Sequence, residues 1–159
     1  MTWTEFSASE PALAQQGQEL IYDVGVGLGF LATTRPDGGP RVHPVCPLIS
    51  DEGLFVFVVP SPKQRDLHRD GRYALHTITL ERNEDAFYLT GAARHVTDEA
   101  VRVTLGKQFA DERVAFAVPA PEPEQHLFAL DVETAVLTRT TGPGDPAPQH
   151  TIWHAPRPD

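Results

Sequence analysis

The sequence predicts a mainly β protein, an antiparallel barrel of six strands with two or three short helices at its ends. Segments rich in β-branched and aromatic residues recur along the chain, and turn residues separate them at hairpin spacing. The strands also follow one another without the long crossovers that a parallel sheet needs. We expect the six strands at residues 28–34, 41–49, 54–59, 73–80, 86–96 and 127–140.

Turn residues set the boundaries of the first strands. Residues 36–39 read Pro-Asp-Gly-Gly, in which proline suits the second position of a turn and glycine tolerates a positive φ. The strands on either side should therefore form a hairpin. Residues 51–53 (Asp-Glu-Gly) predict a second turn, and Gly91 in the middle of the strand 86–96 predicts a β-bulge.

Capping residues predict where the helices begin. Ser9 is suited to cap a first helix, which should end at the glycines of residues 25–29. A second helix should begin at Ser61-Pro62, because serine is favoured as an N-cap and proline at the first helical position. A third should begin after Asp98, whose carboxylate can accept hydrogen bonds from the first free N–H groups.

Length and composition predict one domain in a reducing compartment. The chain of 159 residues suffices for a single core, which we place in residues 1–140, and residues 141–159 form a Pro/Gly-rich tail. The formal charge of −9 argues against a nucleic-acid or membrane partner. No apolar run approaches the ~18 residues of a membrane span, and no basic region precedes an apolar one at the N-terminus. The single cysteine, Cys46, excludes an internal disulfide, so we expect a cytoplasmic protein.

The segment from Ser61 to Lys63 predicts an anion site. The start of a helix presents unpaired N–H groups and a partial positive charge. Lys63 in the first turn opposes the helix dipole at a cost of ~0.3–1 kcal/mol. A bound phosphate would reverse that penalty and add ~1.5–3 kcal/mol through a charged hydrogen bond. An ordinary solvated surface helix is the alternative for this segment.

The order and spacing of several segments resemble the pyridoxamine 5′-phosphate oxidase-like superfamily, the flavin split-barrel proteins. The similarity is good over roughly residues 28–110 and loose in the C-terminal third. It rests on Phe30-Leu31-Ala32-Thr33-Thr34-Arg35-Pro36-Asp37-Gly38, Pro40-Arg41-Val42-His43-Pro44-Val45, the apolar strand 54–59, Ser61-Pro62-Lys63 through Leu67, Asp70-Gly71-Arg72, and Gly91 through Asp98.

The resemblance implies a six-stranded Greek-key split barrel that forms a homodimer and binds FMN at the dimer interface. It implies a flavin-dependent oxidoreductase that acts on a small-molecule substrate. The second strand would lie along the flavin, Ser61 and Lys63 would hold its phosphate, and the tail would reach the site from the partner subunit. No catalytic acid or base is identified. The expected cofactor-binding residues are Arg41, Val42, His43, Pro44, Ser61, Lys63, Gln64, His76, Thr77 and Trp153.

One departure from the family pattern concerns the substrate. Ser61-Pro62-Lys63 stands where the vitamin-forming oxidases have a Ser-Arg-Lys triplet. Their substrate-phosphate residues are also not found in the C-terminal third. Pyridoxamine phosphate is therefore not expected as the substrate.

Two other functions are compatible with the sequence. A non-enzymatic protein could use the same barrel to hold a flavin, a deazaflavin cofactor or haem, with His43 or His76 as the axial ligand of the haem. The second of these functions is that of a cofactor-free dimer that serves only as an interaction module. The histidines show no metal-ligand spacing, and His150 and His154 lie in the tail without a cysteine pair, so no metal site is expected.

Overall fold

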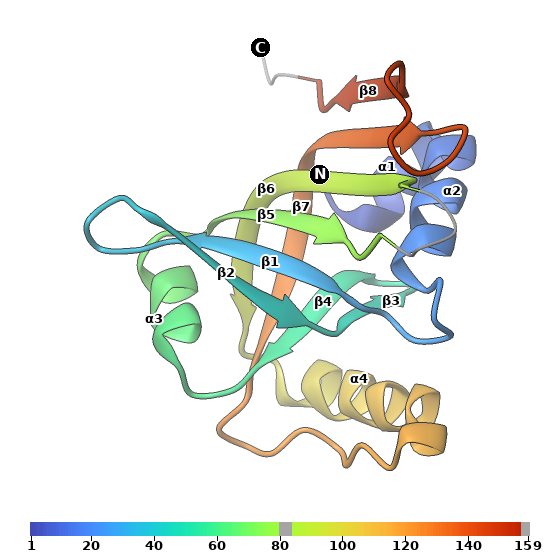
Figure 1. Cartoon of the computed structure of the whole chain (residues 1–159). Helices are drawn as coiled ribbons and strands as arrows, with labels where there is room; N and C mark the ends of the chain where they lie inside the picture. The colour runs from blue at the N-terminus through green and yellow to red at the C-terminus, as the bar shows by residue number, and fades with distance from the viewer. Residues whose placement is uncertain (80–83, 157–159) are drawn as a thin grey trace.

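The computed structural model describes residues 1–79 and 84–156. Within them lies one antiparallel sheet of eight strands in the order β2-β1-β5-β6-β7-β4-β3, with β8 also paired to β7 (Figure 1). None of the described helices is long and apolar enough to span a bilayer. The strands are β1 (Gly29–Thr34), β2 (Pro40–Val45), β3 (Pro47–Ser50), β4 (Gly53–Val58), β5 (Arg72–Thr77), β6 (Ala86–Val96), β7 (His126–Arg139) and β8 (Gln149–His154). The helices are α1 (Trp3–Ser9), α2 (Pro11–Ile21), α3 (Pro62–Arg69) and α4 (Glu99–Glu112), with a short 3-10 turn at Val114–Phe116.

Cys46 joins the two ends of the curled sheet. It follows β2, at one end of the strand order, and precedes β3, at the other end. The single strand predicted for residues 41–49 was therefore wrong, because this segment forms two strands at opposite ends of the sheet. Pro44 and Pro47 flank the break, and a proline lacks the N–H group that a continuous ladder needs.

The helix starts predicted at Ser61 and Asp98 are confirmed. The Ser61 Oγ accepts a hydrogen bond from the backbone N–H of Gln64 at 3.3 Å, and α3 begins at the next residue. The Asp98 carboxylate accepts hydrogen bonds from Ala100 N at 2.9 Å and Val101 N at 3.2 Å, and caps α4 in the same way. Both caps are local, so they could be identified from the residue types alone.

The N-terminal region contains two helices instead of the one predicted. Thr2 and Glu5 form a capping box, in which each side chain accepts a hydrogen bond from the other residue's backbone N–H, and α1 begins there. Ser9 is the last residue of α1, so the predicted cap at Ser9 was wrong. Pro11 begins α2, in the first helical position that suits proline.

The β-bulge predicted at Gly91 is confirmed by a shift of the β6–β7 register between Thr90 and Gly91. A Cβ atom at position 91 would lie 1.8 Å from the carbonyl oxygen of Asp131, so only glycine fits. A bulge bends its strand and increases the local twist. The bulge therefore lets β6 and its partner β7 bend along the curved sheet.

Two hydrophobic clusters form the core. In the main cluster, inside the barrel, Trp3 of α1 packs edge-on against Phe6 and against Phe87 of β6, with ring centroids 5.4 and 6.2 Å away. In the second cluster, between β4 and α4, the rings of Phe57 and Phe109 meet at 5.5 Å. Helices therefore cover the barrel on two sides.

The C-terminal tail pairs with the chain's own β7. β8 runs antiparallel to residues 134–139, and Trp153 packs against Phe6 with ring centroids 4.8 Å apart. A reach of the tail to a partner's site stays a prediction. The last three residues of the tail lie outside the described residues. Leu80, the last residue of the predicted strand 73–80, also lies outside the described residues. The corresponding strand, β5, ends at Thr77.

Replacing Trp153 with alanine should lower the free energy of unfolding by about 2–3 kcal/mol, somewhat less than the loss for a fully buried ring. The reason is the loss of its contact with Phe6, which joins the tail to the main core. Urea denaturation followed by circular dichroism measures the change. Thr151→Ala, at an exposed position of the same strand, is the control and should change stability by less than about 0.5 kcal/mol. Equal effects of the two substitutions would contradict the packing role of Trp153.

Candidate cofactor site

Alternation along β2 places the predicted residues on two faces of the sheet. Arg41 and His43 lie on the inner face, since Arg41 pairs in register with the buried Thr33 of β1. Val42 and Pro44 lie on the outer face. The strand thus contributes to two separate surfaces, and the residues expected to line one cofactor do not all meet.

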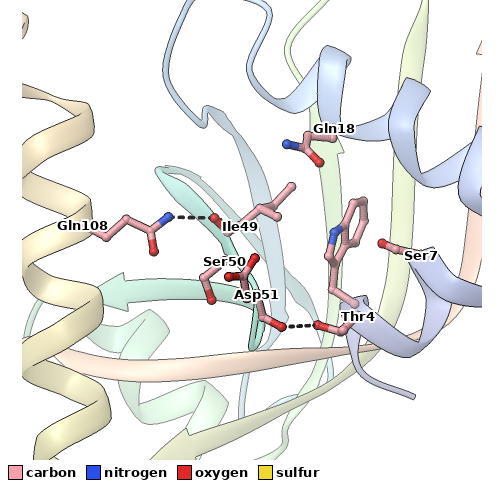
Figure 2. Close-up of a pocket in the computed structure, with 8 residues that line it drawn as sticks. Thr4, Ser7, Gln18, Ile49, Ser50, Asp51 and Gln108 are labelled. Atoms are coloured by element: carbon pink, nitrogen blue, oxygen red, sulfur yellow. Dashed lines mark hydrogen bonds between the residues drawn. The ribbon is translucent and has the colours of Figure 1, made fainter.

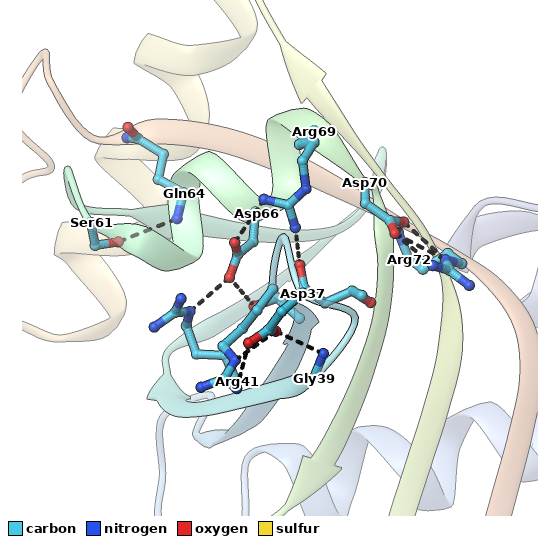
Figure 3. Close-up of polar contacts among 12 residues, drawn as sticks. Asp37, Gly39, Arg41, Ser61, Gln64, Asp66, Arg69, Asp70 and Arg72 are labelled. Carbon is cyan, nitrogen blue, oxygen red and sulfur yellow. Dashed lines mark hydrogen bonds and ion pairs between the residues drawn. The ribbon is translucent and has the colours of Figure 1, made fainter.

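On the inner side, the buried carboxylate of Asp66 binds Arg41 (Figure 3). The Asp66 side chain is only 2% exposed. Its Oδ2 accepts hydrogen bonds from Thr33 Oγ1 at 3.1 Å and Arg41 Nε at 2.7 Å, and its Oδ1 accepts one from Arg69 Nη1 at 3.0 Å. Burial raises the pKa of Asp66, but these hydrogen bonds outweigh burial and hold the pKa below its usual value. Arg41 and Arg69 therefore share one carboxylate, which fixes the Arg41 side chain and offsets only part of the positive charge of the pair.

Two of the predicted cofactor-binding residues, Ser61 and Gln64, hold the first turn of α3 together. The Ser61 Oγ, besides capping the helix, donates to the carbonyl oxygen of Val59 at 2.8 Å. The Gln64 side chain is buried, and its Nε2 donates to the carbonyl oxygens of Val58 at 2.9 Å and Glu124 at 3.1 Å. These contacts give both residues a structural task, and their contact with a cofactor stays a prediction.

Lys63, in the same turn, is free to bind a ligand. It is half-buried and makes no hydrogen bond or ion pair with any described residue. Burial lowers the pKa of its ammonium group, an effect that the nearby Cys46 only partly offsets. A partly desolvated cation without a counter-charge is stabilised by a bound anion.

The outer face carries a mainly apolar row that crosses six strands. Phe30 is 41% exposed and Ile152 is 59% exposed, and Val42 in the neighbouring row is 57% exposed. A hollow of about 320 Å³ beside the row is lined by Ala32, Ala74 and Tyr88, among others. From β2 to β8 the row consists of Pro44, Phe30, His76, Tyr88, Val136 and Ile152.

His76, in this row, is oriented by a hydrogen bond to the backbone. Its Nδ1 lies 2.6 Å from the carbonyl oxygen of Thr77. Because a carbonyl oxygen only accepts, Nδ1 carries the proton and Nε2 keeps its lone pair. The ring is exposed, with its centroid 6.3 Å from that of Tyr88. Thr77 itself is buried, and its Oγ1 accepts a hydrogen bond from Phe87 N at 2.8 Å, so its side chain holds the sheet together.

A wider hollow, of about 640 Å³, is lined by residues of α1, α2 and α4 and by the turn after β3 (Figure 2). On its wall, Gln108 Nε2 donates to the carbonyl oxygen of Ile49 at 2.8 Å, and Thr4 Oγ1 donates to that of Asp51 at 2.9 Å. None of the predicted cofactor-binding residues lines this hollow. It is therefore separate from both faces of β2.

One cluster of three histidines was not predicted from the sequence. His68 of α3, His95 of β6 and His126 of β7 bring their ring nitrogens within 4.8 Å of one another. The expectation that the histidines form no metal site stays untested, although these three rings meet in space. Because the three lie far apart in the sequence, no short spacing pattern could have revealed them.

No family model and no curated protein sequence matches the chain, whereas solved structures do. One is a Clostridium acetobutylicum protein of the pyridoxinephosphate oxidase family, related to general stress protein 26 of B. subtilis. It matches with a TM-score of 0.67 and 14% identity over 91% of this chain and 95% of that one. The chain has the split-barrel fold of the pyridoxamine 5′-phosphate oxidase-like proteins. The predicted split barrel is thus confirmed, with eight described strands instead of six.

Two further matching structures are described as haem proteins. A haem-binding protein from Mycobacterium smegmatis matches with a TM-score of 0.66 and 14% identity over 87% of this chain and 57% of that one. The chain thus spans little more than half of that protein. HutZ, a haem storage protein from Vibrio cholerae, matches with a TM-score of 0.60 and 18% identity over 78% of this chain and 89% of that one.

Replacing Asp66 with asparagine should lower the free energy of unfolding at pH 7 by about 2–4 kcal/mol, since Arg41 and Arg69 lose the carboxylate between them. The pKa of Asp66 is lower in the folded state than in the unfolded chain. The ionised carboxylate therefore stabilises the fold above pH ~4, and this contribution is lost as the pH falls through the folded-state pKa.

Urea denaturation at pH values from neutral down to about 3 tests this prediction, because the wild type should lose its advantage over Asp66→Asn only in the acidic range. Asp37→Asn, which removes an exposed partner of Arg35, is the control and should have a much smaller effect at neutral pH. A stability difference that does not change with pH would contradict the role of the ionised carboxylate.

Proposed function

We propose that this split barrel binds haem on the outer face of its sheet, with His76 as the axial ligand. The hydrogen bond between His76 Nδ1 and the carbonyl oxygen of Thr77 carries the proposal. Histidines that bind a metal through one ring nitrogen usually donate the other N–H to a carbonyl or carboxylate, which fixes the tautomer and the ring. His76 already makes this bond, so the Nε2 lone pair is available to iron.

The surroundings of His76 suit a large, flat, apolar ligand. Phe30 and Tyr88 stand on either side of it in the row, and the hollow beside the row is lined by the small side chains of Ala32 and Ala74. Burial of apolar surface contributes ~25 cal/mol per Å². This face can therefore supply binding free energy without additional polar contacts.

The comparison with known structures supports the same proposal. Two proteins with this fold are described as a haem-binding protein and a haem storage protein, although a shared fold alone does not assign a function. His43, the other ligand predicted from the sequence, lies on the inner face and makes no hydrogen bond with a described residue. His76 is therefore the better-prepared ligand, and a role in haem storage or transfer needs no catalytic residue.

FMN is the second candidate, because Lys63 is a half-buried cation that has no partner among the described residues. Arg41 is held by Asp66, which it shares with Arg69, and the side chains of Ser61 and Gln64 bind backbone groups. A flavin phosphate at this helix start would therefore depend mainly on Lys63. In this case the barrel would serve a flavin-dependent oxidoreductase, with the redox chemistry supplied by the flavin ring.

The homodimer stays a prediction, and we propose the outer face as its interface. Phe30, Val42 and Ile152 are large apolar side chains exposed on this one face. Contiguous exposed apolar surface commonly marks an interaction site on a soluble protein. A second copy of the chain on this face would cover the apolar surface around the haem.

Replacing His76 with alanine should weaken the binding of ferric haem by at least about tenfold and remove the spectrum of a histidine-ligated iron. Titration of the purified chain with haemin, followed at the Soret band, measures both effects. His43→Ala is the matched control and should bind like the wild type. Added imidazole should restore the wild-type spectrum to His76→Ala. An unchanged Soret band and affinity in His76→Ala would refute this ligand assignment.

Replacing Lys63 with alanine should weaken FMN binding by about 10- to 150-fold, the equivalent of one charged hydrogen bond of ~1.5–3 kcal/mol. Quenching of flavin fluorescence gives the affinity. Lys107→Ala, an exposed lysine of α4, is the control. FMN binding that is equal in all three proteins would contradict the phosphate role of Lys63. Failure of the wild type to bind either FMN or haem would favour the deazaflavin cofactor or a cofactor-free dimer.

A further inference from the structure

We propose that His68, His95 and His126 form a binding site for a divalent transition-metal ion such as Zn²⁺. His68 lies in the last turn of α3, His95 lies one residue before the end of β6, and His126 is the first residue of β7. One ring nitrogen from each histidine lies within 4.8 Å of one from each of the other two. Three separate elements thus place three imidazoles around one point.

The pairing of β6 with β7 explains why two of these rings meet. His95 lies directly opposite Phe128, and His126, two residues before Phe128, is on the same face of the sheet. Such diagonal neighbours on paired strands are within reach of each other's side chains. The rings of His95 and His126 accordingly stack, with centroids 4.7 Å apart and planes 25° apart.

Helix α3, which packs beside β6, adds the third ring (Figure 1). The His68 ring stands nearly perpendicular to the other two, with its centroid 4.7 Å from that of His95 and 5.0 Å from that of His126. Beneath them lies the fully buried Phe128, 5.0 Å from the His68 ring and 5.5 Å from the His95 ring. The cluster therefore has an apolar floor on one side and is exposed to solvent at His68 and His95.

Metal binding requires the three nitrogens, which lie within 4.8 Å of one another, to adjust to the spacing of metal ligands. His68 Nε2 lies 2.7 Å from His126 Nδ1, so these two atoms face each other. In a tetrahedral site with Zn–N bonds of ~2.0–2.1 Å, ligand nitrogens lie about 3.3 Å apart. If these two nitrogens moved apart by about 0.6 Å, they would have the spacing of two zinc ligands. The exposed His68 side chain can make this movement.

A metal ion also accounts for the third histidine. Without a metal, His68 and His126 satisfy each other by one hydrogen bond, whereas His95 has no hydrogen-bond partner among the described residues. A bound ion would use all three rings. The negative end of the α3 dipole lies next to His68 and favours a cation there.

The ligand set indicates the kind of ion and leaves one coordination position open. Imidazole nitrogens suit zinc, copper and nickel, whereas magnesium and calcium prefer oxygen ligands. Three histidines with an open fourth position are typical of catalytic zinc sites, in which water or a substrate completes the coordination. Exposure at His68 and His95 makes the fourth position accessible to either.

Titration of the untagged full chain with Zn²⁺ in a calorimeter tests the proposal. We expect one ion per chain with a dissociation constant of about micromolar or tighter. His68→Ala and His95→Ala should each weaken binding by at least about 100-fold, because even loss of an outer-sphere partner commonly costs 10–100-fold. Both side chains are exposed, so these substitutions should leave the fold intact, which circular dichroism checks. Co²⁺ bound by the wild type should show the strong visible absorption of a four-coordinate ion.

Two further histidine variants serve as controls. His150→Ala replaces an exposed histidine of β8, and His76→Ala removes the proposed haem ligand on the outer face; both should bind Zn²⁺ like the wild type. Loss of Zn²⁺ binding in either control would overturn the assignment. Absence of binding by the wild type up to about 1 mM Zn²⁺, an affinity of only ~4 kcal/mol, would overturn it too. So would unchanged binding in His95→Ala.

Discussion

The buried carboxylate of Asp66 determines where α3 lies, and α3 contributes to both sites on the inner side of the barrel. An isolated charge inside a protein is unfavourable, so the Asp66 carboxylate requires the donors that Thr33, Arg41 and Arg69 provide. Thr33 and Arg41 belong to β1 and β2, so the same interaction ties the helix to the sheet. Arg69 also donates to the carbonyl oxygen of Thr34 in β1. With α3 held in this way, its first turn brings Lys63 beside Cys46 and its last turn brings His68 to β6.

The two histidine sites differ in what holds their rings. His76 is oriented by the backbone of its own strand, so its geometry depends on β5 alone. The cluster of His68, His95 and His126 depends on the β6–β7 register and on the docking of α3. A disturbance of α3 should therefore affect the cluster and leave His76 in place. The apolar row around His76 and the cluster of three histidines therefore lie on opposite faces of the sheet.

The parts of the fold that could be predicted from the sequence are those with a local cause. The caps at Ser61 and Asp98 and the bulge at Gly91 each depend on the chemistry of a few neighbouring residues. The split at Cys46 also had a local signal in Pro44 and Pro47, which the interpretation as one strand overlooked.

The candidate sites depended on contacts that no local pattern contains. Alternation shows that Arg41 and His43 share a face, but the β1–β2 register is needed to place that face inside the barrel. The ion pair between Arg41 and Asp66 and the meeting of His95 with His126 arise from residues brought together only by the folded chain. The family resemblance supplied the architecture correctly and could not specify which charges would be neutralised within the protein.

The pairing of β8 with β7 has a consequence for the behaviour of the protein at high concentration. One edge of β7 is covered by β4 along residues 126–129 and by β8 along residues 134–139. Without β8, the second stretch would present a row of unsatisfied N–H and C=O groups to any extended segment of another molecule, which is how edge-to-edge aggregation begins. β8 therefore transfers the free edge from β7 to a strand of only six residues that lies between Pro148 and Pro156, and a short edge bounded by prolines is less prone to such pairing. A truncation at residue 148 would return the free edge to β7 and would also remove the packing of Trp153 on Phe6.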